Sequence, residues 1–158
     1  PLADGMLLLS LISGRNPEFL IGNQVIAAPY LKRSGLEIIS TGYILIESGV
    51  TTSVEYVSNT KPIPPAKTDL VVATAVAGEM LGHKLIYLEA GSGADSPLKP
   101  ALIEEVKKNI RIPLIVGGGI RKKEDVMNMY NAGADIVVVG NAVEENYAIT
   151  LDLAGVSR

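Results

Sequence analysis

PLIVGGGIR at residues 113–121 and GADIVVVGN at residues 133–141 are the two stretches of sequence that decide the fold. In each of them a short apolar run of strand length ends directly in glycine. Similar apolar runs alternate with amphipathic runs of helix length along the whole chain. This alternation predicts an α/β fold, in which a parallel sheet is connected by crossover helices.

Five strand–helix units are expected from the hydrophobic pattern. Strands are predicted at residues 6–12, 36–46, 84–90, 113–116 and 135–139. Helices are predicted at residues 17–34, 68–81, 97–110 and 122–131, with a last helix beginning near residue 141. Pro29 is expected to kink the first helix and Gly35 to end it.

The connection between the second strand and the next helix differs from the others. Residues 47–67 are rich in Ser and Thr and contain Pro62, Pro64 and Pro65, so no regular helix is expected there. The segment is a candidate lid over one end of the fold. The inward face of helix 68–81 is expected to consist of Val72, Ala73, Val76, Ala77 and Met80, and that of helix 97–110 of Leu102, Ile103 and Val106.

The position of the glycine-rich turns favours a barrel over an open sheet. Both turns follow the last two predicted strands, where an eight-stranded β/α barrel carries its phosphate site. We therefore expect a (βα)8 TIM barrel, with residues 1–158 forming a single phosphate-binding domain of about five βα units. A complete barrel usually needs more than about 200 residues, so N-terminal units are expected to be missing from this chain.

Composition excludes several classes of function. The formal net charge is -3 and the basic residues are scattered, which argues against a nucleic-acid partner. The absence of cysteine rules out disulfides and thiolate metal sites and suits a cytoplasmic protein, while the single His83 rules out a two-histidine metal site. His83 is interpreted as a surface or capping residue. No apolar stretch has the length of a transmembrane segment.

The two glycine turns have the chemistry of an anion site. Gly117, Gly118 and Gly119 allow positive φ angles and expose backbone N–H groups, because no Cβ hinders a ligand. A helix that begins at Asn141, just after Gly140, directs its unpaired amides toward the same point. One such turn alone would be explained by a tight connection, but two in successive units favour a phosphate site.

The third predicted strand ends in YLEAGSG at residues 87–93, at the rim where barrel enzymes carry their chemistry. Glu89 is a candidate base that accepts the proton of a substrate hydroxyl, and the alternative is a buried, paired structural carboxylate. Tyr87 offers a phenolic contact. Tyr43 is a packing aromatic residue or a secondary catalytic candidate.

Taken together, several motifs resemble the geranylgeranylglyceryl phosphate synthase family, which includes the bacterial heptaprenylglyceryl phosphate synthases. The motifs are SGRNP (13–17), GYI (42–44), KPIP (61–64), YLEAGSG, PLIVGGGIR and GADIVVVGN. The two glycine motifs occur in many phosphate-binding barrels, whereas YLEAGSG and KPIP are narrower signals. The resemblance spans essentially the whole chain.

This resemblance implies a prenyltransferase that joins the hydroxyl of sn-glycerol 1-phosphate to a polyprenyl diphosphate, with geranylgeranyl diphosphate expected. The product is an ether-lipid precursor, and diphosphate leaves with the help of Mg²⁺, whose ligands are expected on strands absent from this chain. A homo-oligomer is also implied. By the match, Glu89 acts on the glycerol hydroxyl, and the substrate-binding residues are Tyr87, Leu88, Glu89, Ala90, Gly91, Ser92, Gly93, Gly117, Gly118, Gly119, Gly140 and Asn141. On the residues themselves, Tyr43 is the secondary catalytic candidate beside Glu89.

Two other classes of function remain open on the sequence. Another phosphate-binding barrel enzyme, such as a sugar-phosphate isomerase or an FMN-dependent oxidoreductase, would share the glycine turns without needing YLEAGSG. A non-catalytic phosphate-binding barrel would bind glycerol phosphate without turnover. A flavoprotein would be yellow when purified.

Overall fold

A five-stranded parallel sheet is the framework of the computed structural model, which describes residues 3–156. The strands lie in chain order and are β1 (Gly5–Leu11), β2 (Glu37–Leu45), β3 (Leu85–Glu89), β4 (Leu114–Gly117) and β5 (Ile136–Val138). Each neighbouring pair is parallel. All five predicted strands are confirmed, with every boundary within one residue of its expected position.

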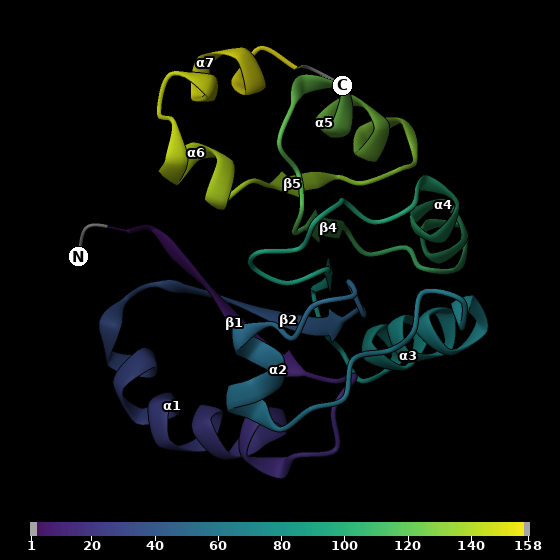
Figure 1. Ribbon diagram of the computed structural model, residues 1–158. Coiled ribbons are helices and arrows are strands. Elements are labelled where there is room, and N and C mark those ends of the chain that lie inside the picture. Colours follow the sequence, from purple (N-terminus) through teal and green to yellow (C-terminus); the bar gives the residue numbers. More distant parts are fainter. Residues whose placement is uncertain (1–2, 157–158) are drawn as a thin grey trace.

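Eight helical segments accompany the strands in the part of the chain that the structure describes. They are η1 (Glu18–Gly22), α1 (Asn23–Ser34), α2 (Ser53–Ser58), α3 (Thr68–Met80), α4 (Pro100–Asn109), α5 (Lys123–Asn131), α6 (Asn141–Glu145) and α7 (Ile149–Ala154). Of these, α3, α4 and α5 cover one face of the sheet. Figure 1 shows α1, α3, α4 and α5 along the outside of an arc of strands. A doubly wound sheet would reverse its strand order at a switch point, whereas this uninterrupted order is that of a barrel arc.

The two faces of the sheet have different surroundings because successive side chains alternate along each strand. The face covered by helices contains Ile44, Ile86, Leu88, Leu114 and Val116, all with an exposed fraction of 0%. The inner face of the arc carries a second cluster of Leu11, Tyr43, Leu45, Leu85, Tyr87 and Ile115. Glu89 shares this alternation with Tyr87 and is therefore also on the inner face.

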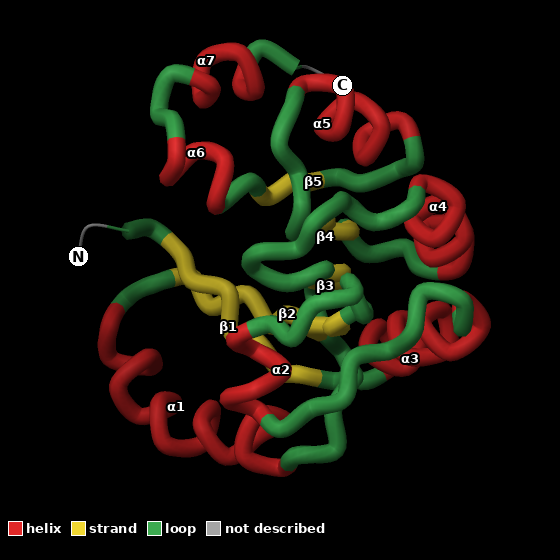
Figure 2. The backbone as a smooth tube through the Cα atoms, viewed as in Figure 1, coloured by secondary structure: helices red, strands yellow, loops and turns green. Residues whose placement is uncertain are grey.

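Residues 47–67 contain a short helix, so the prediction of no regular helix there was wrong. Thr52 caps α2, because its side chain accepts a hydrogen bond from the Glu55 backbone N–H at 3.3 Å. Asn59 follows the helix with a positive φ of 49° and ends it. All three prolines come after this point. Figure 2 shows α2 close to β1 and β2, inside the ring of outer helices.

The buried face of α3 also differs from the prediction. Val71, Ala75 and Gly78 are its buried residues, with Val72 and Val76 half-buried beside them. Met80, expected to face inward, is 81% exposed. The helix is apolar on nearly all sides, so its pattern could not identify the buried face. In α4, by contrast, the expected burial of Leu102, Ile103 and Val106 is confirmed.

Two helix starts differ from their predicted positions. The first helical segment opens with the single π-type turn η1, and α1 follows, with Pro29 inside it and Gly35 ending it at a φ of 75°. Helix α4 begins at Pro100, three residues after its expected start, and places this proline in the first turn. The predicted kink at Pro29 remains a prediction.

His83 follows the end of α3, where its backbone N–H donates to the Gly78 carbonyl at 3.1 Å and caps the helix, in line with its interpretation as a surface or capping residue. Its ring is half-buried, and Nδ1 lies 2.9 Å from the Ser40 hydroxyl oxygen. The edge of the ring lies near Gly42 and Gly78, where a Cβ at Gly42 would stand 3.1 Å from His83 Cδ2. Burial lowers the pKa of the His83 imidazole. The residue therefore fastens the end of α3 to β2.

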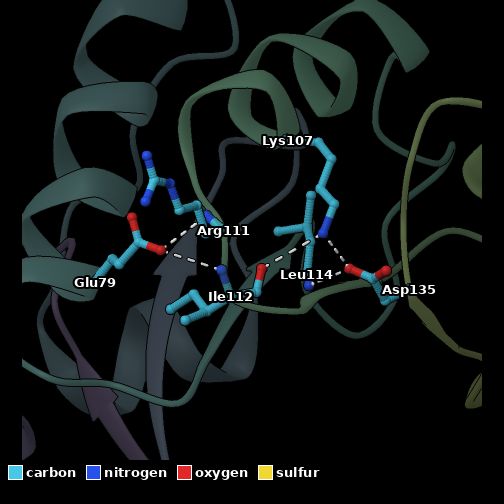
Figure 3. A network of polar contacts seen from close by, with 6 residues as sticks. All are labelled: Glu79, Lys107, Arg111, Ile112, Leu114 and Asp135. Carbon is cyan, nitrogen blue, oxygen red and sulfur yellow. Dashed lines mark hydrogen bonds and ion pairs between the residues drawn. The ribbon is translucent and has the colours of Figure 1, made fainter.

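Polar contacts join the helices at the start of β4 (Figure 3). The Glu79 carboxylate of α3 accepts hydrogen bonds from the backbone N–H groups of Arg111 and Ile112 at 2.8 and 3.1 Å. Lys107 Nζ of α4 lies 2.6 Å from Asp135 Oδ2, just before β5. These contacts hold the amino ends of β4 and β5 in place. They therefore also help to position the carboxyl ends of both strands.

Candidate functional site

A cavity of about 220 Å³ opens where β3, β4 and β5 end. Because the strands are parallel, their carboxyl ends and the loops that follow share one rim. The cavity is lined by Tyr43, Val54, Glu89, Ser92, Ala94, Gly118, Gly119, Ile120, Arg121, Val138, Gly140, Asn141 and Glu144. The cavity therefore brings together residues from all three segments that the sequence predicted to bind the substrate: YLEAGSG, the glycine turn after β4 and the Gly140–Asn141 turn.

Glu89 is the buried carboxylate of this cavity, with an exposed fraction of 8%. Its Oε1 accepts a hydrogen bond from the Gly91 backbone N–H at 2.8 Å, and the Tyr87 hydroxyl also donates to the carboxylate. Burial raises the pKa of the Glu89 carboxyl above its usual value, while these two hydrogen bonds oppose the rise. A carboxylate held this way is oriented and is a stronger base than an exposed one.

The turn after β4 comes so close to its neighbours that it needs glycine. Gly118 and Gly119 have φ angles of 87° and 69°, which confirms the expected positive values. A Cβ at Gly118 would stand 2.6 Å from Glu89 Oε1, and one at Gly119 would stand 2.2 Å from the Ser96 carbonyl oxygen. At Gly117, a Cβ would stand 2.6 Å from the Tyr87 hydroxyl. The turn is thus packed directly against the Glu89 loop.

The turn after β5 reaches the same cavity. Gly140 has φ -109° and ψ -89°, outside the positive-φ region, and Asn141 is the first residue of α6. The Ser92 hydroxyl donates to Asn141 Oδ1 at 3.2 Å, which ties the loop after β3 to the start of α6. The two glycine turns therefore face one another across a single cavity, as the sequence predicted.

The predicted site residues divide into two groups. Seven line the cavity: Tyr43, Glu89, Ser92, Gly118, Gly119, Gly140 and Asn141. Six do not: Tyr87, Leu88, Ala90, Gly91, Gly93 and Gly117. Leu88 and Ala90 belong to the core on the helical side of the sheet, because they alternate with Glu89. Tyr87, Gly91 and Gly117 instead surround the Glu89 carboxylate. The substrate-binding role of all six remains a prediction.

Six residues of the cavity were not among the predicted site residues: Val54, Ala94, Ile120, Arg121, Val138 and Glu144. Arg121 brings a guanidinium to the rim, where it also lies 3.5 Å from the Glu145 carboxylate. Its position directly after the glycine turn in the sequence could have indicated that Arg121 lies at the site. Glu144 adds a carboxylate that opposes anion binding. Val54 comes from α2, whose start is marked in the sequence by the Thr52–Glu55 spacing of a capping box.

A second, larger cavity of about 490 Å³ adjoins the first. Its lining comes from β1, β2, η1, α1 and α2 and is mostly apolar: Leu9, Leu11, Phe19, Asn23, Gln24, Tyr43, Ser53, Val54, Val57 and Ser58. Tyr43 and Val54 line both cavities. The rim therefore offers a polar compartment and an apolar compartment that meet at these two side chains.

Neither a metal-binding cluster nor a membrane-spanning helix is found among residues 3–156. Within that part of the chain, no three His, Cys, Asp or Glu side chains come together in a way that could hold a metal ion. No helix that the structure describes is long and apolar enough to cross a membrane.

The fold and the site define a β/α-barrel protein whose site lies at the carboxyl ends of the strands, where barrel enzymes carry their chemistry. A sequence model described as the PcrB family matches residues 1–154. The chain belongs to the PcrB family. The resemblance expected from the motifs is thereby confirmed.

Curated relatives agree with this assignment. The geranylgeranylglyceryl phosphate synthase of Spirosoma linguale is 54% identical over 156 residues, covering 99% of this chain and 63% of that protein. Its counterpart in Chitinophaga pinensis is 53% identical over 152 residues, covering 96% of this chain and 60% of that protein. The chain thus spans less than two thirds of the length of these relatives.

Solved structures show the same fold. Wild-type GGGPS from Thermoplasma volcanium matches with a TM-score of 0.88 at 36% identity, covering 97% of this chain and 62% of that chain. (S)-3-O-geranylgeranylglyceryl phosphate synthase from Thermoplasma acidophilum, in complex with substrate sn-glycerol-1-phosphate, has the same TM-score at 33% identity, covering 96% of this chain and 60% of that chain. These matches confirm the predicted barrel-type α/β fold.

Proposed function

We propose that this protein is a prenyltransferase that joins the hydroxyl of sn-glycerol 1-phosphate to a polyprenyl diphosphate, with geranylgeranyl diphosphate the expected donor. The observation that carries the proposal is the pair of adjoining cavities. One has the glycine turns and a buried carboxylate, the other is apolar, and Tyr43 and Val54 line both. A phosphate ester and a long hydrocarbon chain are the two substrates that such a pair fits.

The glycerol phosphate occupies the smaller cavity in this proposal. Backbone N–H groups of Gly118, Gly119 and Asn141 bind its phosphate, and the Arg121 guanidinium adds positive charge at the rim. Glu144 opposes this binding, which limits affinity at low ionic strength. The solved structure of the Thermoplasma acidophilum enzyme in complex with substrate sn-glycerol-1-phosphate supports the choice of this ligand.

Glu89 acts on the free hydroxyl of the bound glycerol phosphate. The hydroxyl oxygen forms a bond to the allylic carbon of the prenyl diphosphate, and the bond between that carbon and the diphosphate oxygen breaks. Diphosphate leaves with the electron pair, and the hydroxyl proton passes to the Glu89 carboxylate. The Gly91 N–H and the Tyr87 hydroxyl orient the carboxylate for this transfer.

The larger cavity receives the hydrocarbon tail. Leu9, Leu11, Phe19 and Val57 provide the apolar surface, and burial of each CH₂ group contributes about 0.8 kcal/mol. A sugar-phosphate isomerase has no use for such a compartment next to its phosphate site. This cavity is therefore the observation that favours the prenyltransferase over the other phosphate-binding barrels considered above.

The proposal includes Mg²⁺ as a cofactor, and its only support is the resemblance to the family. The residues that the structure describes do not provide a ligand set for a metal ion, so no step of the mechanism is derived through one. The homo-oligomeric state and the cytoplasmic location remain predictions from the sequence.

The full-length protein tests the proposal directly. It is incubated with sn-glycerol 1-phosphate, Mg²⁺ and prenyl diphosphates of several lengths, and products are followed by mass. The expected result is a prenylglyceryl phosphate and an equimolar amount of diphosphate, both lost in Glu89→Gln. Binding of glycerol phosphate without any product would identify a non-catalytic phosphate-binding barrel instead, and a yellow, flavin-containing preparation would identify an oxidoreductase.

A further inference from the structure

Thr52 lies between α2 and the loop that follows Glu89. Its side chain is buried, with an exposed fraction of 4%, and its hydroxyl caps α2. Its Cβ and methyl group face Gly91, because a Cβ added at Gly91 would stand 2.8 Å from Thr52 Cβ and would overlap the methyl carbon. Gly91 has a φ of 96°, so both its conformation and its surroundings require glycine.

Gly91 in turn holds the carboxylate that acts as the base. Its backbone N–H donates to Glu89 Oε1 at 2.8 Å. The turn after β4 also confines it, since a Cβ at Gly118 would stand 2.9 Å from the Gly91 nitrogen. Loss of the contact with Thr52 would therefore give the Gly91 N–H room to move away from Glu89.

The other end of α2 is attached in a similar way. Thr60 follows the helix, has an exposed fraction of 3% and packs against Gly14, where a Cβ would stand 2.9 Å from Thr60 Cγ2. Between the two threonines, Val54 and Val57 form part of the wall of the apolar cavity. The contact at Thr52, unlike the one at Thr60, involves a residue that donates to the proposed base.

We propose that Thr52 is a positioning residue of the prenyl-transfer reaction, whose methyl group holds Gly91 where its N–H orients the Glu89 carboxylate. The inference rests on the proposed function, in which Glu89 takes the proton of the glycerol hydroxyl. Thr52 lines neither cavity and acts only through Gly91. Proton transfer requires close hydrogen-bond geometry, so a small displacement of the base lowers the rate of the reaction.

The pKa of Glu89 reports on this arrangement. Burial raises that pKa, and the hydrogen bonds from Tyr87 and from Gly91 oppose the rise. A substitution at Thr52 leaves the other titratable side chains around the carboxylate in place. They are Tyr43, Tyr87, Arg121 and Glu144. A further rise of the Glu89 pKa in such a variant therefore measures a weaker hydrogen bond from Gly91.

Variants of the full-length protein separate the two tasks of the Thr52 side chain. Thr52→Ser keeps the cap and removes the methyl group. We expect it to lower the rate constant of a single turnover about tenfold with KM little changed, because the Tyr87 hydroxyl still holds the carboxylate. The midpoint of its pH–rate profile should lie at higher pH than that of the wild type.

Thr52→Val keeps the methyl group and removes the cap of α2. We expect it to raise KM for the prenyl diphosphate about fivefold, the size of one N-cap contribution, with the rate constant and the pH midpoint unchanged. Thr60→Ser is the control at the other end of α2, where it removes a methyl group that is equally buried. It should leave the rate constant and the pH midpoint as in the wild type.

The ¹³C chemical shift of the Glu89 carboxyl tests the contact without requiring turnover. Its titration should give a higher pKa in Thr52→Ser than in the wild type, and an unchanged pKa in Thr52→Val and Thr60→Ser. An unchanged pKa and rate constant in Thr52→Ser, or an effect on KM alone, would overturn the proposal and leave Thr52 a helix cap. Absence of turnover in the wild type would refute the proposed function, whereas the carboxyl titration would still decide whether Thr52 positions Glu89.

Discussion

Replacing Gly118 with alanine separates backbone strain from damage to the site. Gly118 has a φ of 87°, and Gly82, at the end of α3, has a similar φ of 93°. A Cβ at Gly82 would meet nothing within 4 Å, whereas one at Gly118 would stand 2.6 Å from Glu89 Oε1. Gly82→Ala therefore carries only the left-handed strain, roughly 1–2 kcal/mol. It is the matched control for Gly118→Ala.

The additional effect at Gly118 can be worked from the contact. Ordinary van der Waals contact begins at 3.4 Å, so the carboxylate must retreat by about 0.8 Å from its position at 2.6 Å. That shift stretches its 2.8 Å hydrogen bond from the Gly91 N–H. Crowding of this kind adds about 1–3 kcal/mol to the strain. The total destabilisation expected for Gly118→Ala is about 2–5 kcal/mol.

Urea unfolding gives the stability of both variants, and calorimetric titration with sn-glycerol 1-phosphate gives the affinity. We expect Gly82→Ala to unfold at slightly lower urea and to bind normally. Gly118→Ala should unfold at clearly lower urea and lose glycerol phosphate affinity by at least about tenfold, equivalent to 1.4 kcal/mol. Equal stability and equal affinity in the two variants would refute the claim that this turn is packed against the site.

Three further predictions concern Glu89 and Asp135. At pH 7 Glu89→Gln should raise the melting temperature while abolishing turnover, because it removes a charge whose burial is unfavourable; the gain should vanish below pH 4.5, the usual pKa, where the carboxyl is protonated in both states. In the wild type, kcat should fall as pH is lowered, with a midpoint above 4.5, since the base form is required. Asp135→Ala should cost about 1–3 kcal/mol in urea unfolding, because the carboxylate accepts from Lys107 and from the Leu114 N–H at 2.8 Å.

The strands and the glycine turns could be read from the sequence because their signals are local. Continuous apolar runs mark strands covered on both faces, and glycine marks positions such as Gly118 where a side chain has no room. The sequence also predicted that the two glycine turns lie close together, because neighbouring parallel strands have their carboxyl ends at the same edge of the sheet. Glu89 could be placed there for the same reason.

The apolar cavity could not be predicted in the same way. Its walls come from β1, β2, α1 and α2, and no local pattern shows that these surfaces leave a space between them. The role of α2 was hidden by the prolines after it, which outweighed the capping signal at Thr52. The face of α3 was ambiguous because small apolar residues surround it, and only packing against the sheet selected Val71, Ala75 and Gly78.

The central claim is that the turns after β4 and β5 bind one phosphate together. Amide chemical shifts of the ¹⁵N-labelled full-length protein, recorded during titration with sn-glycerol 1-phosphate, test it residue by residue. The account predicts that the amides of Gly118, Gly119 and Asn141 shift together along a single binding curve, while that of Gly82 shifts little. Shifts confined to one turn, or centred on a distant loop such as that of Arg15, would contradict it.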